Sequence, residues 1–258
     1  MPNQPPKLWE HQRQTLAFSY DHPLVFDTSS AGTGKTAAWA RSMQHRLEAD
    51  CSRVVVLCPK SLMYSAWGED LELFTPDLTI SYAEAPEDNR MKALREDTNV
   101  LVVNSDAVRW MAKLGKRELK RHLGRKPMML VDESALFKNP AASRTKALIY
   151  LSNLFEYRTA MSGTAAPTSV TELWSQVRVV DGGARLGTRY QLFRSLMQES
   201  VNINGFKVWT DVPEARVLTH AMIRSITIGH KFSKVMKNVP DMEKRKVYYH
   251  LTDKHRAL

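Results

Sequence analysis

A lysine and a threonine that follow two closely spaced glycines have the residue types of a phosphate-binding loop. They occur in the stretch Ser29-Ser30-Ala31-Gly32-Thr33-Gly34-Lys35-Thr36. A short apolar run at residues 24–26 precedes the stretch, and residues 36–49 have helix-forming composition. This order of strand, loop and helix is the context in which such a loop binds phosphate. Gly32 and Gly34 let backbone N–H groups converge on an anion, and the N-terminus of the helix adds partial positive charge.

The polar side chains of this loop predict a nucleotide site that uses Mg²⁺. Lys35 is expected to reach the β- and γ-phosphates, and the Thr36 hydroxyl is expected to hold the metal ion. The other residues expected to contact the nucleotide are Ser30, Ala31, Gly32, Thr33 and Gly34. The first glycine of the usual G-x-x-x-x-G-K-T pattern is Ser29 here, so the strict pattern fails by one residue. A chance G-x-G-K-T in a basic protein is the alternative, and the strand and helix around the loop argue against it.

An acidic pair, Asp132-Glu133, directly follows the apolar run at residues 128–131. Asp132 is expected to bind the Mg²⁺ held by Thr36, and Glu133 is expected to orient or deprotonate the attacking water. Open α/β sheets bind ligands at the carboxyl ends of their strands, so both carboxylates should converge on the phosphate loop. The alternative is a solvated pair that complements the dipole at the start of a helix.

Short apolar runs alternate with helix-forming segments over the first 160 residues. Strands are expected at residues 24–26, 53–59, 78–82, 100–103, 128–131 and 157–161. Helices are expected in most of the gaps, including residues 8–20, 36–49 and the segment after Ser61. The continuous β-branched run at 53–59 is typical of a parallel strand buried on both faces. This alternation predicts an α/β fold with a doubly wound parallel sheet.

The composition narrows the class of protein. The 258 residues are enough for one large domain or one domain with an appendage, and an apolar content of 43% is enough for a packed core. The sequence contains no apolar run of about 18 residues, so no membrane span is expected, and the polar, proline-rich start is unlike a signal peptide. Cys51 and Cys58 are expected to be reduced and buried, as in a cytoplasmic protein. The cysteines and histidines lack ligand spacing, so no structural metal is expected.

Basic residues suggest a polyanionic partner. The net charge is +10, and residues 109–126 contain eight Lys or Arg residues and one acid. Their spacing places Lys113, Lys116 and Lys120 on adjacent rows of one helix. This helix face could bind phosphates or could simply be solvated, and the sequence leaves both open. A second row, for which a solvated face is favoured, comprises Lys231, Lys234 and Lys237. The tryptophans expected in the core rather than stacked on bases are Trp39, Trp67, Trp110 and Trp174.

Five short motifs, taken in order, are similar to those of a known ATPase family. Residues 8–12 resemble a Q motif, residues 30–36 resemble motif I, and residues 58–62 resemble motif Ia. Residues 131–140 resemble motif II, including a Lys-Asn-Pro after the acidic pair, and residues 158–167 resemble motif III. The chain thus resembles the first RecA-like domain of a superfamily 2 helicase-type ATPase. More narrowly, it is similar to the Swi/Snf-type DNA translocases, in compact phage or bacterial form.

The resemblance implies roles for further residues. It makes Gln12 the contact to adenine and Lys60 of motif Ia a contact to the DNA backbone. Ser162, Gly163 and Thr164 of motif III would couple the nucleotide to DNA. ATP and Mg²⁺ are the implied cofactors, and Lys35 and Glu133 the implied catalytic residues.

The sequence departs from the family pattern at the coupling motifs. Ser134 and Ala135 follow Glu133 where the family usually has alanine and histidine, and the absent histidine is the one that couples ATP to DNA. Ala165 stands where a proline commonly follows Ser-Gly-Thr. These departures bear on the coupling between nucleotide and DNA rather than on the class.

The resemblance spans about residues 8–254 and implies three parts. Residues 1–170 would be a RecA-like P-loop lobe that binds ATP, and residues 171–240 a mostly helical, protrusion-like extension of the same lobe. Residues 241–258, with a strand expected at 246–251, would begin the linker to a second RecA-like lobe. That lobe is absent from this sequence, which is therefore expected to be a piece of a longer protein.

These observations predict the ATP-binding first motor lobe of a translocase acting on double-stranded DNA, in the bacterial cytoplasm or a phage-infected cell. Hydrolysis by the isolated lobe should be weak, because the arginine finger of such motors comes from the second lobe. One alternative is an RNA or single-strand helicase lobe; residues 138–140 and the helical region after motif III favour duplex DNA. The other is a stand-alone nucleotide-dependent binding module without turnover.

Overall fold

A seven-stranded parallel sheet organises the protein. The computed structural model describes residues 5–166, 168–203 and 206–236. In that part of the chain the strand order is β3-β4-β2-β5-β6-β1-β9, and every pairing is parallel. The strands are β1 (Leu24–Asp27), β2 (Val54–Cys58), β3 (Ile80–Ala83), β4 (Val100–Asn104), β5 (Met128–Val131), β6 (Tyr157–Met161) and β9 (Thr227–Ile228). The predicted doubly wound parallel sheet is confirmed.

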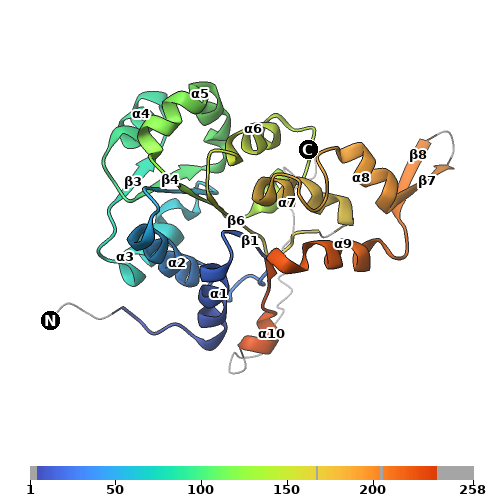
Figure 1. Cartoon of the computed structure of the whole chain (residues 1–258), viewed down its shortest axis with the longest axis horizontal. Helices are drawn as coiled ribbons and strands as arrows, with labels where there is room; N and C mark the ends of the chain where they lie inside the picture. Colours follow the sequence, from blue (N-terminus) through green and yellow to red (C-terminus); the bar gives the residue numbers. More distant parts are fainter. Residues whose placement is uncertain (1–4, 167, 204–205, 237–258) are drawn as a thin grey trace, which may run out of the picture.

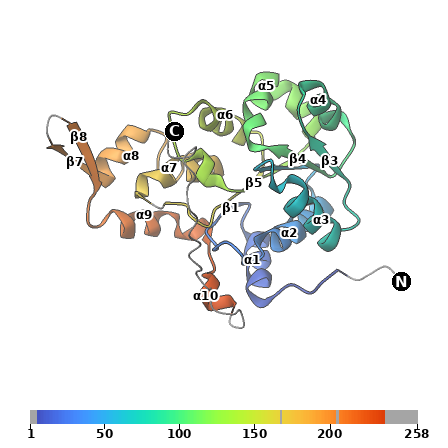
Figure 2. The same cartoon turned by 180° about the vertical axis from the view of Figure 1, so that it is seen from behind.

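Helices cover both faces of this sheet (Figures 1 and 2). The helices that precede β6 in the chain are α1 (Glu10–Asp21), α2 (Lys35–Ala49), α3 (Glu69–Phe74), α4 (Glu87–Arg95), α5 (Val108–Leu123) and α6 (Ser143–Ser152). Those after it are α7 (Leu173–Asp181), α8 (Tyr190–Met197), α9 (Ala215–Ile223) and α10 (Phe232–Val235). Shorter helical turns are η1 (Met63–Gly68), η2 (Ser105–Ala107), η3 (Ser134–Phe137), η4 (Val170–Glu172) and η5 (Arg224–Ile226).

The core lies on the two faces of the sheet. All five residues of β2 are buried, which explains its unbroken apolar sequence. Val55 and Leu57 pack with residues of α4, α5, α6 and α7, whereas Val54 and Val56 pack with residues of α2 and α3, as the two-residue period of a strand requires. The four tryptophans expected in the core are confirmed there, each at most 5% exposed. Both cysteines are buried and free, and burial raises the pKa of Cys58 to about 12.

The strand order brings three loops to one edge. β5, β6 and β1 are neighbours in the sheet, in that order. Val131 is paired with Ala160, and Asp27 with Met161, so these strands end almost level. Because the strands are parallel, the loops that follow them leave from the same carboxyl edge. These loops are the predicted phosphate loop, the loop of the acidic pair and the loop of Ser162.

The C-terminal part is mostly helical, as predicted, and also contains strands that the sequence did not predict. β7 (Gln198–Ile203) and β8 (Phe206–Asp211) form an antiparallel hairpin, and β9 returns to pair with β1 at the sheet edge. The hairpin was missed because the residues of β8 are exposed or half-buried and so lack a buried apolar period. In Figures 1 and 2 it forms the tip of a projection made with α8 and α9. The division at residue 170 stays a prediction; α7, beyond it, packs on β6 and β1.

The predicted continuous row of lysines on the basic helix is wrong. Gly115 lies inside α5 at φ 77° and ψ 158°, which breaks the helix into two segments. Lys113 therefore has a different helical register from Lys116 and Lys120. The second segment ends beside the start of β2, where the Ser52 hydroxyl donates to the Leu123 carbonyl at 2.6 Å. Lys120 thus lies toward the amino edge of the sheet, opposite to the phosphate loop.

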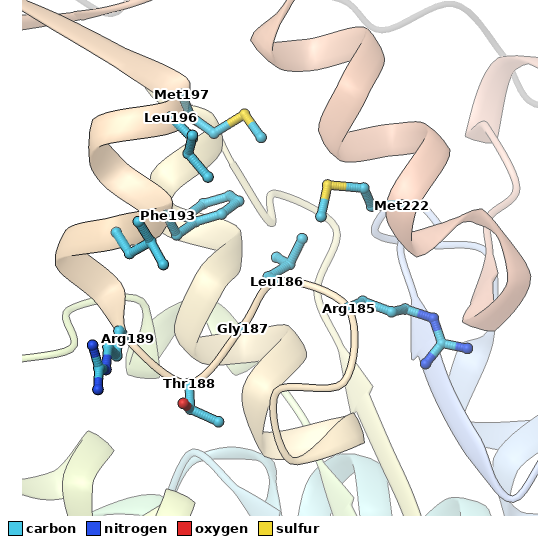
Figure 3. Close-up of a pocket in the computed structure, with 10 residues that line it drawn as sticks. Arg185, Leu186, Gly187, Thr188, Arg189, Phe193, Leu196, Met197 and Met222 are labelled. Atoms are coloured by element: carbon cyan, nitrogen blue, oxygen red, sulfur yellow. The ribbon is translucent and has the colours of Figure 1, made fainter.

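An apolar groove of about 440 Å³ separates α8 from α9 (Figure 3). Leu186, Leu196 and Met222 line it, and among the described residues its charged lining groups are two arginines. No carboxylate, thiol or imidazole from the described part of the chain lines this groove. The candidate site is therefore the carboxyl edge of the sheet.

Some expectations fall outside the described residues. These are Pro167 of motif III, Lys237 of the second basic row, residues 238–240, and the linker with its strand at 241–258. None of the described helices is long and apolar enough to cross a membrane.

Candidate nucleotide-binding site

The phosphate loop follows β1 and ends at the first residue of α2. Gly32 and Gly34 have φ angles of 77° and 67°, a region that costs glycine nothing and other residues strain. A Cβ atom on Gly34 would also lie 2.4 Å from Nε2 of Gln12. Both glycines are thus required by backbone conformation, and the second also by a close contact.

Lys35 lies over its own loop. Its ammonium donates to the carbonyls of Ser29 and Ser30 at 2.9 and 3.1 Å. Burial raises the pKa of both Asp132 and Glu133, and the positive charge of Lys35 opposes that rise in each. The lysine and the acidic pair, about 100 residues apart in sequence, therefore belong to one electrostatic site, as the sequence predicted.

Asp132 is 8% exposed and is held by two N–H groups. The indole Nε1 of Trp67 donates to Oδ2 at 3.0 Å, and the backbone N–H of Glu133 donates to Oδ1 at 2.9 Å. Burial raises the pKa of Asp132, while the Trp67 donor and the charge of Lys35 oppose that rise. Trp67, in η1, was assigned only to the core from sequence, so its contact with the carboxylate was missed.

Glu133 adopts a strained backbone. Its φ and ψ are both 51°, in the left-handed region, which costs a residue with a side chain on the order of 1 kcal/mol or more and is concentrated at functional sites. Burial raises the pKa of Glu133, the charge of Asp132 adds to the rise, and Lys35 opposes it. A carboxylate with a raised pKa is suited to accept a proton near neutral pH.

Asp27, the last residue of β1, is a further buried carboxylate that the sequence analysis did not single out. It is fully buried and accepts hydrogen bonds from the Ser29 N–H and from Nε1 of Trp39, both at 2.8 Å. These bonds fix the first turn of the phosphate loop onto α2. The signal that could have found it is the same as for Asp132, an acid at the end of a buried apolar strand.

Thr36 lies at the start of α2 and contacts a further acid. Burial raises the pKa of the Asp70 carboxyl of α3, and the nearby Thr36 side chain opposes that rise. Within the described residues, no group of three or more His, Cys, Asp or Glu side chains is arranged to hold a metal ion. A site made from Thr36 and Asp132 would thus use few protein ligands.

The loop of Ser162, Gly163 and Thr164 packs against the phosphate loop. The Ser162 N–H donates to the carbonyl of Asp27 at 3.0 Å. A Cβ atom on Gly163 would lie 3.0 Å from the backbone nitrogen of Ala31, so the two loops approach as closely as their backbones allow. The structure therefore brings this predicted coupling segment to the nucleotide site.

Gln12 contacts the phosphate loop. Its Nε2 donates to the Gly34 carbonyl at 3.0 Å, and its Oε1 accepts from the Trp9 N–H at 2.8 Å. The neighbouring His11 lies 2.7 Å from the carbonyl of Thr33. The start of α1 is thereby tied to the loop, and the contact of Gln12 with adenine stays a prediction.

The segment after β9 also reaches the phosphate loop, which the sequence did not predict. The N–H of Ser30 donates to the carbonyl of His230 at 2.9 Å, and the N–H of His230 donates to the Ser29 hydroxyl at 3.1 Å. The ring of Phe232 lies against Gly32, 3.0 Å from where a Cβ atom would be. No local pattern marks these contacts, because they join residues about 200 positions apart.

The residues predicted to meet nucleic acid are dispersed. Lys60 is exposed and follows β2 on the carboxyl edge, near Asn104 at the end of β4. Lys113 is exposed in the first segment of α5, and the Lys116 ammonium lies 4.5 Å from the centre of the Tyr150 ring. Lys120 is exposed toward the opposite edge. The structure thus brings Lys60, but not Lys120, to the edge that carries the phosphate loop.

A family model, the SNF2-related domain, matches residues 13–258. The chain belongs to the SNF2-related domain family. Membership of this family implies nucleotide use, as the loop geometry does independently.

Curated proteins similar to this SNF2-related domain include an animal and a phage protein. It is 22% identical over 249 residues to a SWI/SNF-related matrix-associated actin-dependent regulator of chromatin subfamily A-like protein 1 homolog of Caenorhabditis elegans, covering 94% of this chain and 34% of that protein. It is 26% identical over 191 residues to putative protein p41 of Acyrthosiphon pisum secondary endosymbiont phage 1, covering 67% and 39%. The chain thus spans between a third and two fifths of these relatives.

Solved structures share the fold of this SNF2-related domain. The Sulfolobus solfataricus SWI2/SNF2 ATPase core in complex with double-stranded DNA matches with a TM-score of 0.69 at 20% identity, over 92% of this chain and 48% of that one. The UvsW helicase from bacteriophage T4 matches with a TM-score of 0.51 at 17% identity, over 69% and 60%. At these identities the likeness establishes the RecA-like fold alone.

Proposed function

We propose that this SNF2-related domain is the ATP-binding first motor lobe of a DNA-dependent ATPase that moves along double-stranded DNA. The observation that carries the proposal is the meeting of three loops at one sheet edge. The loop of Ser162 contacts the phosphate loop through its backbone, and the charge of Lys35 acts on the carboxylates of Asp132 and Glu133. The family and the Sulfolobus core with double-stranded DNA support this choice.

The residues of the site fit ATP and Mg²⁺. Mg²⁺ prefers oxygen ligands, and the Asp132 carboxylate with the Thr36 hydroxyl would supply two of them. The phosphates would lie on the loop from Ser30 to Thr36, beside the ammonium of Lys35. ATP bound with Mg²⁺ supplies the γ-phosphate that is transferred to water.

Three further side chains, Glu133, Lys35 and Gln12, would have separate roles in hydrolysis and nucleotide binding. Glu133 would orient the water and take its proton, for which a raised pKa is suited. Lys35 would balance the negative charge that spreads over the phosphate oxygens. Gln12 would read adenine, and a second RecA-like lobe would supply the arginine that completes the site.

A groove on the helical side of the domain supports the nucleic-acid part of the proposal. It has a volume of about 740 Å³, lies between α6, α7 and α8, and starts at Asn139 and Pro140 after the acidic pair. Its charged lining residues are Lys146, Arg178 and Arg194, and none of the three has an ionic partner in the described part of the chain.

An exposed aromatic side chain and a further cation lie at this groove. Tyr150, 46% exposed, lies at its wall with the ammonium of Lys116 over the ring. Cations beside an aromatic side chain suit a phosphate backbone. We assign contact with DNA to Lys60 on the carboxyl edge, to this groove and to Lys116. We interpret Lys120 as a solvated residue.

Hydrolysis of ATP by the complete product of the reading frame, with duplex DNA, single-stranded DNA or RNA added, tests the proposal. We expect stimulation by each DNA, largest with the duplex, and none in Lys35→Ala. Stimulation by RNA alone would favour the helicase alternative. Nucleotide-dependent DNA binding without turnover would favour the binding module. In a bacterial or phage setting, which the phage relative supports, the substrate would be DNA in the cytoplasm.

A further inference from the structure

Two buried polar side chains connect the acidic pair to the loop after β6. Ser134, directly after Glu133, is 2% exposed, and its hydroxyl donates to Oε1 of Gln176 at 2.7 Å. Gln176 lies on α7 and is 1% exposed. Its Nε2 donates to the carbonyl of Ala165 at 2.6 Å and to that of Glu172 at 2.9 Å. We call this chain of hydrogen bonds, Ser134 to Gln176 to Ala165, the Gln176 bridge.

The Gln176 amide can have only one orientation in this bridge. A primary amide has two N–H donors and one carbonyl acceptor, and the two carbonyls of Ala165 and Glu172 take both donors. Oε1 must then face Ser134, so the serine hydroxyl is the donor. An amide turned the other way would set Oε1 against two carbonyl oxygens. The side chain of Gln176 is therefore held rigidly at both ends.

Burying the Gln176 amide is costly, because most of the other buried positions of α7 are apolar, Ser175 and Asp181 being the polar exceptions. Val177, Val179 and Val180 of α7 are all buried in the same core cluster. A buried amide or hydroxyl is tolerated when its hydrogen bonds are made and costs free energy when they are broken. An aliphatic residue would fill this position without that condition, so packing alone gives no reason for an amide here.

The two ends of the bridge lie at functional loops. Ser134 is covalently next to Glu133, whose left-handed backbone persists only if its neighbours fix it. The Asp132 carboxylate fixes Glu133 from the other side through its N–H. Ala165 ends the segment whose start packs on the phosphate loop through Ser162 and Gly163. One amide thus connects the residue after the candidate general base to the loop that packs against the phosphate loop.

We propose that Gln176 is a positioning residue for ATP hydrolysis, which acts through Ser134 to keep Glu133 in place as the loop after β6 responds to nucleotide. The inference rests on the proposed function, since it concerns the turnover of that site. Gln176 is 1% exposed and its amide is engaged by Ser134, Ala165 and Glu172, so it is not placed to contact the nucleotide itself. Its loss should lower turnover without lowering affinity for nucleotide.

The kinetic test compares Gln176→Met, Ser134→Ala and the double variant in the complete protein, with duplex DNA present. Each change removes the same connection, so we expect kcat to fall about tenfold in both single variants and no further in the double variant. KM for ATP and the affinity for a fluorescent ATP analogue should stay within about twofold. Ser152→Ala is the matched control, because it deletes a buried serine hydroxyl that only donates within its own helix, to Ile149. It should keep the parent kcat.

A second measurement does not require turnover. Binding of a non-hydrolysable ATP analogue should slow amide hydrogen exchange both at residues 162–166 and at residues 133–137 in the parent. In Gln176→Met the slowing should remain at the first segment and disappear at the second. A purely structural glutamine would instead raise exchange in both segments, with and without the analogue.

The outcomes separate the two proposals. A parent protein that binds the analogue but never hydrolyses ATP would overturn the proposed function, and the exchange experiment would still decide the bridge. Parent kcat in both single variants, additive losses in the double variant, or unchanged transfer of protection in Gln176→Met would each overturn the role of Gln176.

Discussion

The indole nitrogen of Trp67 donates a hydrogen bond to Oδ2 of Asp132 at 3.0 Å, in a buried setting. The tryptophan follows β2 and the aspartate follows β5, and these strands are neighbours in the sheet. Because burial raises the pKa of Asp132 and this donor lowers it, the ring that closes one side of the core also helps to keep the proposed Mg²⁺ ligand ionised. The Trp67 side chain thus contributes both to core packing and to the ionisation of the proposed metal ligand.

Trp67→Phe should weaken Mg²⁺ binding. The variant loses a hydrogen bond to an ionised group, worth about 1.5–3 kcal/mol, so the pKa of Asp132 should rise further. A larger share of the carboxyl is then protonated, and Mg²⁺ needs the ionised form. We expect the Mg²⁺ concentration for half-maximal ATP binding to increase, and the increase to shrink as pH is raised from 6 to 8. Trp110→Phe is the control, since its buried indole nitrogen has no partner among the described residues, and it should leave the Mg²⁺ requirement unchanged.

Lys35→Ala should lose nucleotide binding and keep the fold. Among the described residues the ammonium hydrogen-bonds to two carbonyls of its own loop and forms no salt bridge, so its removal breaks no ion pair. We expect a melting temperature close to that of the parent and a loss of affinity for ATP, measured by titration with a fluorescent analogue. Parent-like affinity in this variant would remove the assignment of the phosphate loop.

Glu133→Gln should separate binding from turnover. The amide keeps the shape of the side chain but cannot take a proton, so ATP binding should persist while hydrolysis falls by about 10² or more. Parent-like hydrolysis would exclude Glu133 as the base.

The pH profile of the parent should report the same group. Burial and Asp132 raise the pKa of Glu133 above its usual 4.5, and the base must be ionised to act. Hydrolysis should therefore decline, as pH is lowered, at a higher pH than for an ordinary glutamate. The acidic limb of kcat against pH measures this value. A profile that stays flat down to about pH 4.5 would contradict the raised pKa.

Lys146→Gln with Arg194→Gln should weaken binding to duplex DNA and flatten its salt dependence. Each cation that meets a phosphate contributes a slope of about 0.9 in a plot of log affinity against log salt, so two contacts predict a decrease of roughly 1.8. Lys92→Gln with Arg95→Gln removes the same charge from α4, where two acids lie in the same shallow pocket, and should change the slope little.

The lysines of α5 give a graded comparison. Lys116 lies at the groove through Tyr150, whereas Lys120 lies toward the opposite edge of the sheet. Lys116→Gln should therefore reduce the salt slope by about one unit, and Lys120→Gln should leave it unchanged. Equal effects of the two substitutions would mean that the whole face of α5 meets DNA, as a single continuous helix would have implied.

The sequence by itself determined the parts whose signal is local. The glycines and lysine of residues 29–36 specify the phosphate loop, because only that composition gives left-handed turns beside a helix N-terminus. β5 and β6 occur at the residues predicted, and β1, β2, β3 and β4 within two residues. The signal is clearest for β2 and β5, because strands buried on both faces read as unbroken apolar runs. The acidic pair after one such run predicted the second half of the site.

Only the tertiary structure decided which side chains hold these groups. Trp67 and Asp132 are 65 residues apart, and His230 and Ser29 are 201 apart. Their meeting depends on the order of strands in the sheet, which local patterns do not encode. The break at Gly115 was equally hidden, because the lysine spacing around it is compatible with one unbroken helix and glycine alone permits both conformations. The amide of Gln176 looks unremarkable in sequence, and its partners come from two loops that the fold brings together at the buried side of α7.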